Sequence, residues 1–367
     1  MHYLALPLDS YALCTTLTLV SSSKSILLGK QIHAYASKSG WMSSIFVGGA
    51  LIDLYGKSGD VYGAHQLFDE IPLKNTVCAN ALLMGYIESR HWVEGLSLVR
   101  KIHGLCLDAD GFTISAILRI CAELPAAAFG MQVHAYLIRK IESEDAFVLS
   151  SLIEMYGKCG LAGKARLVFE SAWSTVRKGD IILWTSMLNA YGRNGCLDDV
   201  IKAYEEMLAE GTRPDEIAVL AVLSACCHSG EFVKGLRYFE LAMIDYRVVL
   251  GSEHYGCVVD MLCRAGELER AWKFANEMVL KKGSCGSSGL SVTVWGALLS
   301  ACRLHGNADI GKLAAEKAIE LDPGNVGIYI ELSNLYARVG MWDELGKLRE
   351  VMKEKQLEKH VGSSRLE

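Results

Sequence analysis

The sequence predicts an all-α protein, an α-solenoid superhelix of stacked helix-turn-helix repeats. The first observation is an internal repeat: the pattern of Gly29–Phe68 returns as Gly130–Phe169 at a constant offset of 101 residues. The second is a succession of amphipathic segments of about 10 to 14 residues, with no alternating strand pattern of comparable strength. A single helical hairpin cannot bury its own apolar stripe, so the repeats are expected to stack and share one seam.

The stretch from residue 50 to 71 illustrates the repeating element, a helical hairpin. Its first helix carries apolar residues at i, i+3 and i+4 spacing: Leu51, Ile52, Leu54 and Tyr55. We expect this helix to end at Gly56, where a turn over 56–60 begins. The second helix has its own apolar stripe: Val61, Ala64, Leu67, Phe68 and Ile71. Four of the five prolines fall between such helices, where a missing amide donor costs least: Pro72, Pro125, Pro214 and Pro323.

The offset of 101 residues divides into repeats of 35, 31 and 35 residues. Residues 1–9 are an N-terminal remnant, and 10–291 form about eight repeats: 10–44, 45–75, 76–110, 111–145, 146–180, 181–215, 216–251 and 252–291. The repeat 146–180 resembles 45–75 with about four extra residues near Trp173–Lys178, and Lys281–Ser291 reads as an exposed Gly/Ser loop. Two further hairpins follow at 292–325 and 326–367, and the polar tail from Gln356 is expected to fray.

Composition limits the classes of function. The chain has 367 residues, 51% of them hydrophobic, and a net charge of −5. It therefore has enough apolar surface to fold, and it lacks the basic field of a purely electrostatic DNA binder. No apolar run reaches the roughly 20 residues that span a bilayer. The N-terminus lacks the Arg- and Ser-rich character of a transit peptide and begins inside a repeat, so a cleaved leader is not visible in this chain.

Sites for metal, cofactor or catalysis are not predicted. The twelve cysteines stand singly in apolar helical patterns, as at Cys78, Cys121, Cys263 and Cys302, without CxxC or zinc-type Cys/His spacing. We therefore expect reduced core cysteines, no metal and no cofactor. A phosphate-binding GxxxxGK[ST] loop is also absent, and the acidic residues on the repeat helices read as solvent-facing.

The repeat motifs carry a family resemblance. NALLMGY (80–86), LIDLYGKSG (51–59), GKQIHAY (29–35), GTRPDE (211–216) and LSACCHSG (223–230), in units of 35 and 31 residues, resemble a plant pentatricopeptide-repeat (PPR) protein of the PLS subclass. The closing hairpins resemble the E1 and E2 motifs of that subclass, and the resemblance covers residues 10–367. It implies binding of single-stranded RNA, one nucleotide per repeat, in a groove lined by the first helices.

The resemblance also implies which side chains read the bases. The fifth and last residues of a repeat contact the base edge, and the second residue packs on its face. In the repeat 76–110 these residues are Asn80, Asp110 and Val77, a combination that resembles the uracil-preferring one. In 181–215 they are Thr185, Asp215 and Ile182, which resemble the guanine-preferring one, as do Ser150 and Asp180 of 146–180.

The remaining repeats carry little base information. Gly49 with Asn75 offers no side-chain donor at the fifth position, and no base preference is drawn from it. The L-type repeats, which read weakly, have Cys14 with Ser44, Ser115 with Asp145, and Leu220 with Gly251. Because the family binds RNA with the N-terminal repeat at the 5′ side, the expected footprint contains 5′-U-N-G-G-3′.

Each of these residues also has a purely structural interpretation. Asp, Asn, Ser and Thr near helix starts are typical N-caps, and capping does not exclude base recognition. Val77 and Ile182 can equally be core residues. Tyr55, Tyr156 and Tyr191 lie at a fixed place in the inter-helix seam, which favours packing over stacking on RNA. The charged stretch Lys347–Lys359 is typical of a solvated helix face.

The resemblance implies a specificity subunit in organellar C-to-U RNA editing. The deaminase domain of related proteins needs His-x-Glu and CxxC, and this chain has neither, so we predict no catalytic residue and no enzyme activity. A deaminase or other editing-complex protein is expected to bind through residues 292–367. Mitochondria are the preferred compartment, with plastids as the alternative. Other possibilities are a PPR factor for RNA processing, splicing or stability, and a tetratricopeptide-like scaffold that binds a peptide.

Overall fold

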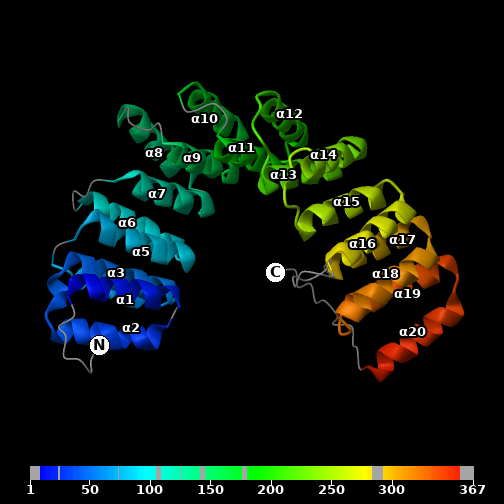
Figure 1. Cartoon of the computed structure of the whole chain (residues 1–367), viewed down its shortest axis with the longest axis horizontal. Coiled ribbons are helices and arrows are strands. Elements are labelled where there is room, and N and C mark those ends of the chain that lie inside the picture. The colour runs from blue at the N-terminus through cyan, green and yellow to red at the C-terminus, as the bar shows by residue number, and fades with distance from the viewer. Residues whose placement is uncertain are drawn as a thin grey trace, which may run out of the picture. The chain divides into compact units, whose positions relative to one another are not determined.

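The computed structural model describes residues 9–23, 25–72, 74–104, 109–124, 126–140, 145–175, 180–282 and 292–355. Within these ranges the chain forms twenty α-helices, one short 3-10 helix at Trp41–Ser43 and no strand (Figure 1). This confirms the predicted all-α class. Contacts divide the chain into an N-terminal unit, residues 1–194, and a C-terminal unit, residues 195–367, each described here by itself. The predicted tail from residue 356, the loop over 283–291, the insertion at 176–179 and Pro125 lie outside the described residues.

The helices follow one another as hairpins, each with a first and a second helix. The first helices are α1 (Ser10–Ser22), α3 (Ile45–Lys57), α5 (Thr76–Glu88), α7 (Gly111–Glu123), α9 (Ala146–Lys158), α11 (Ile181–Arg193), α13 (Glu216–Ser229), α15 (Ser252–Arg264), α17 (Val292–His305) and α19 (Val326–Val339). The second helices are α2 (Ile26–Lys38), α4 (Val61–Glu70), α6 (Trp92–Gly104), α8 (Ala127–Lys140), α10 (Ala162–Thr175), α12 (Leu197–Ala209), α14 (Phe232–Ile244), α16 (Leu268–Lys282), α18 (Ala308–Leu321) and α20 (Trp342–Glu354).

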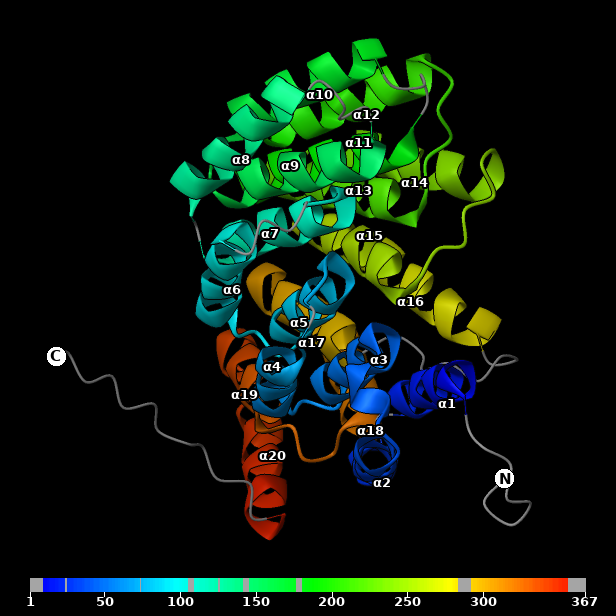
Figure 2. The ribbon, with the colours of Figure 1, turned by 90° about the vertical axis from the view of Figure 1, so that its left-hand side faces the viewer.

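Each unit is a two-layer stack. Within each unit, a first helix packs on the first helix of the next hairpin, as α5 on α7 and α7 on α9 in the N-terminal unit, and α15 on α17 and α17 on α19 in the C-terminal unit. The second helices of the N-terminal unit form the other layer, as α6, α8 and α10 show in both views (Figures 1 and 2). The stack is the solenoid architecture predicted from the repeat.

The apolar stripes become the seam between the layers. The five stripe residues predicted for the second helix of the hairpin at 50–71 are all at most 4% exposed: Val61, Ala64, Leu67, Phe68 and Ile71. The largest fully buried side chains are Trp184 on α11 and Trp295 on α17. The four cysteines predicted for the core are also buried, and burial raises the pKa of Cys121 to about 12. The cysteines of the described residues are all free thiols.

One helix end differs from the prediction. The helix α3 does not end at Gly56 but continues to Lys57, and Gly59 takes the left-handed conformation with φ 84°. Gly160, Gly230 and Gly340 occupy the same turn position with positive φ, where the absence of Cβ removes the steric cost. Arg90 has φ 58° at this position of its own hairpin, so the turn geometry persists there without glycine.

Gly56 serves a different purpose from the predicted one, because it allows two helices to approach closely. A Cβ added at Gly56 would lie 3.0 Å from Cα of Gly85 on α5. A similar contact occurs at Gly157, 101 residues after Gly56: a Cβ at Gly157 on α9 would lie 2.9 Å from Cα of Ala190 on α11. The first-helix layer of the N-terminal unit is therefore closely packed at these points.

Histidine–tyrosine pairs join three second helices, α2, α4 and α8, to the first helix that follows each of them. The hydroxyl of Tyr55 lies 3.0 Å from Nδ1 of His33, and that of Tyr156 lies 2.8 Å from Nδ1 of His134. The tyrosines are buried, so the structure places them in the seam and not on a free surface. The two pairs stand 101 residues apart, as the internal repeat requires.

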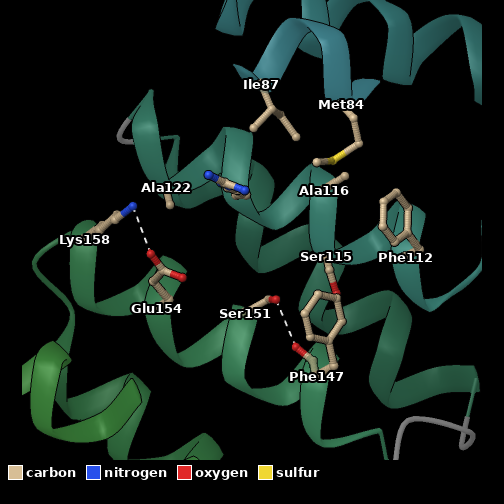
Figure 3. Close-up of a pocket in the computed structure, with 11 residues that line it drawn as sticks. Met84, Ile87, Phe112, Ser115, Ala116, Ala122, Phe147, Ser151, Glu154 and Lys158 are labelled. Carbon is tan, nitrogen blue, oxygen red and sulfur yellow. Dashed lines mark hydrogen bonds and ion pairs between the residues drawn. The ribbon is translucent and has the colours of Figure 1, made fainter. Parts of the chain in front are cut away.

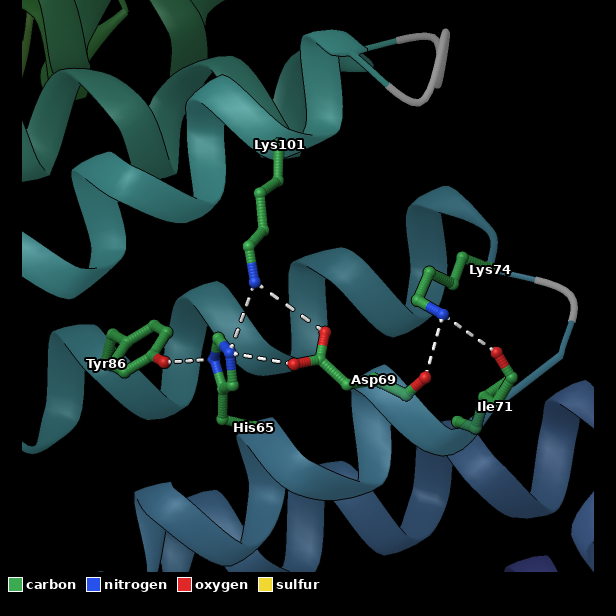
Figure 4. Close-up of polar contacts among 6 residues, drawn as sticks. All are labelled: His65, Asp69, Ile71, Lys74, Tyr86 and Lys101. Atoms are coloured by element: carbon green, nitrogen blue, oxygen red, sulfur yellow. Dashed lines mark hydrogen bonds and ion pairs between the residues drawn. The ribbon is translucent and has the colours of Figure 1, made fainter.

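A third histidine–tyrosine pair is part of a polar network that involves α4, α5 and α6. His65 on α4 contacts the Tyr86 hydroxyl on α5, and its Nε2 lies 3.2 Å from Asp69 (Figure 4). Lys101 on α6 reaches the same group, 3.7 Å from the Asp69 carboxylate. Lys74 donates to the carbonyls of Asp69 and Ile71, at 3.1 and 3.0 Å, and so closes the turn after α4. These contacts tie α4, α5 and α6 together.

The burial of His134 is expected to make stability dependent on pH. Burial and the nearby Lys164 lower the pKa of His134 below its ordinary value of 6.5. Since the unfolded chain binds this proton more readily, the contribution of neutral His134 to stability is present above pH 6.5 and is lost as the pH falls below it. We expect the urea midpoint of the wild type to fall between pH 7.5 and 5.5, and that of His134→Gln to fall less. His228→Gln, at an exposed position, is the control and should retain the wild-type pH dependence.

Candidate nucleic-acid interface

A row of exposed apolar side chains marks the first-helix layer. In the N-terminal unit the second residue of each first helix is at least 46% exposed: Tyr11, Phe46, Val77, Phe112, Phe147 and Ile182. Ile217 repeats the feature in the C-terminal unit at 48%. Large apolar groups repeated at one exposed position are unlike the scattered apolar residues of an ordinary surface. They form a surface suited to an apolar or aromatic ligand.

Two members of this row, Val77 and Ile182, were predicted from the sequence as base-packing residues. With 66% and 51% of their surfaces exposed, neither is a core residue, which removes the structural alternative for them. The sequence reasoning missed the other five. The signal that identifies them is their constant place as the second residue of the first helix.

The Asn and Asp residues predicted at the last position all cap helices through their side chains, whereas Ser44 and Gly251 make no side-chain cap. Each carboxylate or amide oxygen accepts a backbone N–H near the start of the next first helix, at 2.7 to 2.9 Å: Asn75 from Cys78, Asp110 from Thr113, Asp145 from Phe147, Asp180 from Ile182 and Asp215 from Ala218. The capping role is therefore real. It leaves open the second carboxylate oxygen of each Asp for other partners.

One of the predicted pairs is joined through side chains. Asn80 is 9% exposed, and its Nδ2 donates to Oδ1 and Oδ2 of Asp110 at 3.3 and 3.4 Å. Thr113, fully buried on α7, places its Oγ1 2.8 Å from Asn80 Oδ1 and 2.7 Å from Asp110 Oδ1. Burial raises the pKa of Asp110, but hydrogen bonds from Thr113 and Asn80 outweigh it and hold the pKa below its ordinary value of 3.8.

The other fifth-position residues bond elsewhere. Ser150 donates to the carbonyl of Phe147 at 2.9 Å, and Thr185 donates to that of Ile181 at 3.0 Å, both within their own helices. Ser115 is 5% exposed, and its hydroxyl oxygen is buried with no hydrogen-bond partner in the described part of the chain. Thr185 belongs to the N-terminal unit and Asp215 to the C-terminal unit. Among the described residues, Asn80 is thus hydrogen-bonded to Asp110, whereas no hydrogen bond joins Ser115 to Asp145 or Ser150 to Asp180.

A hollow of about 290 Å³ opens on the first-helix layer of the N-terminal unit. Its lining comes from α5, α7 and α9 (Figure 3): Met84, Ile87, Phe112, Ser115, Ala116, Arg119, Ala122, Phe147, Ser151, Glu154 and Lys158. It combines two exposed aromatic rings, Phe112 and Phe147, with the unpartnered hydroxyl of Ser115. An aromatic wall with a few polar groups is the composition expected of a site for a flat heteroaromatic ligand.

The two cations of the hollow differ in their availability. Lys158 is held by Glu123 at 2.6 Å and by Glu154 at 2.9 Å. Burial lowers the pKa of Lys158, but these two carboxylates outweigh it and raise the pKa above its ordinary value. Arg119 is exposed and makes no salt bridge among the described residues, although, after the hydrogen bond from Lys158, its charge helps to lower the pKa of Glu123. An anion that enters the hollow therefore meets an exposed guanidinium at Arg119.

Groups for metal binding or membrane insertion were also sought. Within the described ranges, no three His, Cys, Asp or Glu side chains lie together as a metal site would require. The helices of that same part of the chain are too short or too polar to cross a membrane.

Comparison with known protein families finds the same repeats. A PPR repeat model matches residues 49–75, 147–172 and 253–282, and a PPR repeat family model matches 179–228. An E motif model matches residues 305–367.

Known proteins similar to this chain carry the corresponding names. Two Arabidopsis thaliana pentatricopeptide repeat-containing proteins, one named chloroplastic and one mitochondrial, are 35% and 33% identical to it. The alignments cover 93% and 98% of this chain, and 39% and 56% of the two relatives. A third Arabidopsis relative is 34% identical over 98% of this chain and 51% of its own length, so the chain spans about half the length of the relatives it matches.

Among solved structures, the pentatricopeptide repeat protein PPR10 in complex with an 18-nt psaJ RNA element resembles this chain with a TM-score of 0.66. The match has 17% sequence identity and covers 89% of this chain and 47% of that one. At this identity the likeness concerns the fold.

Proposed function

Because this chain belongs to the pentatricopeptide-repeat family and carries an E motif, we propose that it binds single-stranded RNA in a sequence-specific manner through its first-helix layer. It acts by binding and is not itself an enzyme. The observation that carries the proposal is the hollow at α5, α7 and α9, where Phe112 and Phe147 stand exposed beside the Ser115 hydroxyl and the exposed Arg119. Unpaired bases stack on aromatic rings, and their phosphates bind arginine.

The base preferences follow from the fifth and last residues. Asn80 with Asp110 takes uracil, Ser150 with Asp180 and Thr185 with Asp215 take guanine, and the repeat of Ser115 and Asp145 between them contributes a weakly read position. The proposed footprint is 5′-U-N-G-G-3′. Four exposed second-position residues that the sequence reasoning missed, Tyr11, Phe46, Phe112 and Phe147, extend the proposed track along the N-terminal unit.

The E motif favours a more specific role. We place the chain in the PLS subclass, as a site-recognition factor for C-to-U editing of organellar transcripts, with a deaminase or other editing-complex protein recruited in trans through residues 292–367. The E motif match to residues 305–367 supports this assignment. Relatives named mitochondrial and chloroplastic support an organellar location, of which we propose the mitochondrion.

Selection from a random single-stranded RNA pool tests the proposal. The purified chain should enrich U-N-G-G, with the U preference relaxed by Asn80→Ala and the preference for the last G relaxed by Thr185→Ala. Absence of RNA retention at low salt would overturn RNA binding and favour a peptide-binding scaffold. The editing role is tested separately, by sequencing organellar transcripts from cells without the protein: a cytidine near such a footprint should remain unedited.

The exposed arginine of the hollow gives a second test. Arg119→Ala should weaken RNA binding and reduce the slope of log affinity against log salt by about 0.7, the contribution of one phosphate contact on a single strand. Binding isotherms at several salt concentrations measure both quantities. Arg139→Ala is the matched control, because Arg139 is an exposed arginine on the second helix α8 of the same repeat. Equal slopes for all three proteins would show that Arg119 does not contact phosphate.

A further inference from the structure

We propose that Thr113 is a positioning residue for base recognition: its hydroxyl fixes the orientation of the Asn80 amide and thereby the base that the repeat 76–110 selects. The inference rests on the proposed RNA-binding function and deepens it. Thr113 lies on the following hairpin, 33 residues from Asn80, and is fully buried. Its contact with Asn80 Oδ1, at 2.8 Å, is the shortest that the amide makes, because the bonds from Nδ2 to Asp110 measure 3.3 and 3.4 Å.

The allocation of protons supports a single orientation. Asp110 is a carboxylate and only accepts, so it requires the amide nitrogen of Asn80 on its side. The amide oxygen then faces Thr113 Oγ1, whose single hydroxyl proton is shared between Asn80 Oδ1 at 2.8 Å and Asp110 Oδ1 at 2.7 Å. Asp110 Oδ1 also accepts the backbone N–H of Thr113 at 2.7 Å, whereas the Thr113 hydroxyl is the one donor to Asn80 Oδ1 among the described residues. In the flipped amide, the oxygen of Asn80 would face the carboxylate, which is repulsive.

A fixed amide determines which hydrogen-bond donor and acceptor Asn80 presents to a base. With Nδ2 engaged by Asp110 and Oδ1 by Thr113, Asn80 retains one N–H donor and one lone pair, in a defined spatial order. Uracil and cytosine present opposite donor and acceptor patterns at N3 and at the exocyclic group of C4. An amide that flips freely satisfies either pattern, whereas an amide held in one orientation discriminates between them.

In the next two hairpins of the N-terminal unit, the residue at the position of Thr113 has no hydroxyl that could hold a fifth-position side chain. The residues equivalent to Thr113 are Val148 and Leu183, both buried and without a polar group. Their fifth-position partners are Ser115, whose hydroxyl has no partner, and Ser150, which bonds to its own helix. Among these hairpins, a hydroxyl at the position of Thr113 therefore occurs only next to the repeat 76–110, whose fifth and last residues, Asn80 and Asp110, are hydrogen-bonded to each other.

The test compares Thr113→Val with Thr113→Ser. Valine keeps the volume and removes the hydroxyl, whereas serine retains the hydroxyl. Dissociation constants are measured for RNAs that differ only at the base opposite the repeat 76–110. We expect Thr113→Val to reduce the ratio of the dissociation constant for the cytosine RNA to that for the uracil RNA at least threefold. Thr113→Ser should keep the wild-type ratio. If the wild-type protein binds RNA and selects uracil, and Thr113→Val shows the same ratio of dissociation constants as the wild type, the inference is overturned.

A measurement without RNA keeps the inference separate from the proposed function. In the free protein labelled with ¹⁵N, the side-chain amide protons of Asn80 should exchange with water faster in Thr113→Val than in the wild type or in Thr113→Ser. Identical amide shifts and exchange in all three proteins would show that Thr113 does not hold the amide. If the wild type retains no RNA, the proposed function fails, and the reading role of Thr113 fails with it.

Discussion

Replacing Phe112 and Phe147 together by alanine should weaken RNA binding by a factor of about 5 to 150. Both rings line the hollow on the first-helix layer, and they are 46% and 53% exposed. Base–aromatic stacking contributes about 1–3 kcal/mol per base when measured by alanine substitution, and the hollow has room for one base. Because about half of the surface of each ring is exposed to solvent, their removal should change the stability of the fold by less than about 0.5 kcal/mol.

A matched variant separates stacking from a general loss of apolar surface. Ile138 on α8 and Leu167 on α10 are 67% and 66% exposed on the second helices of the same two repeats. The double variant Ile138→Ala and Leu167→Ala should bind RNA as the wild type does. Isotherms at one fixed salt concentration, with circular dichroism melts of each protein, measure both quantities. If the two double variants lose affinity equally, the first-helix layer is not the RNA-binding face.

Gly157→Val should destabilise the N-terminal unit by about 3 kcal/mol or more. The Cβ of any residue at this position would lie 2.7 Å from Cβ and 2.9 Å from Cα of Ala190, and the latter is backbone that cannot rotate away. The helices α9 and α11 must separate to admit the side chain, and overpacking of this kind costs about 1–3 kcal/mol even where side chains can adjust. Separation also opens the seam that each neighbouring hairpin shares.

The control for this substitution lies six residues away. A Cβ at Gly163 on α10 would meet no atom within 4 Å, so Gly163→Val makes the same chemical change in open space. Urea denaturation followed by circular dichroism should show a lower midpoint for Gly157→Val and a midpoint near that of the wild type for Gly163→Val. A wild-type midpoint in Gly157→Val would mean that the two helices do not approach as closely as the structure describes.

Local sequence patterns were sufficient to predict the helices and their caps. The spacing of apolar residues at 61–71 predicted the buried stripe of α4, because the period of a helix depends only on neighbouring residues. Asp110 and Asp180 were recognised as both candidate caps and candidate base-reading residues, and their capping bonds are present. The end of α3 was misplaced by one residue because Gly56, read as a terminator, serves a contact with Gly85 that lies 29 residues further along the chain.

The tertiary structure alone decided which surfaces remain free. Phe112 and Phe147 have the hydrophobicity of core residues, and only the stacking of the hairpins leaves the second position of each first helix uncovered. The sequence places Lys158 four residues from Glu154, but its shorter contact is with Glu123, 35 residues away.

The sequence by itself thus determined the all-α class, the repeat and the residue types available to meet RNA, because each of these follows from local periodicity and from the similarity between repeats. Only the tertiary structure decided that Asn80 is held by Asp110 and Thr113, while the Ser115 hydroxyl has no hydrogen-bond partner among the described residues. The physical reason is that these contacts form between successive hairpins. Their geometry depends on how the helices stack, and a short hydrogen bond is sensitive to displacements of less than 1 Å, which no pattern along the chain encodes.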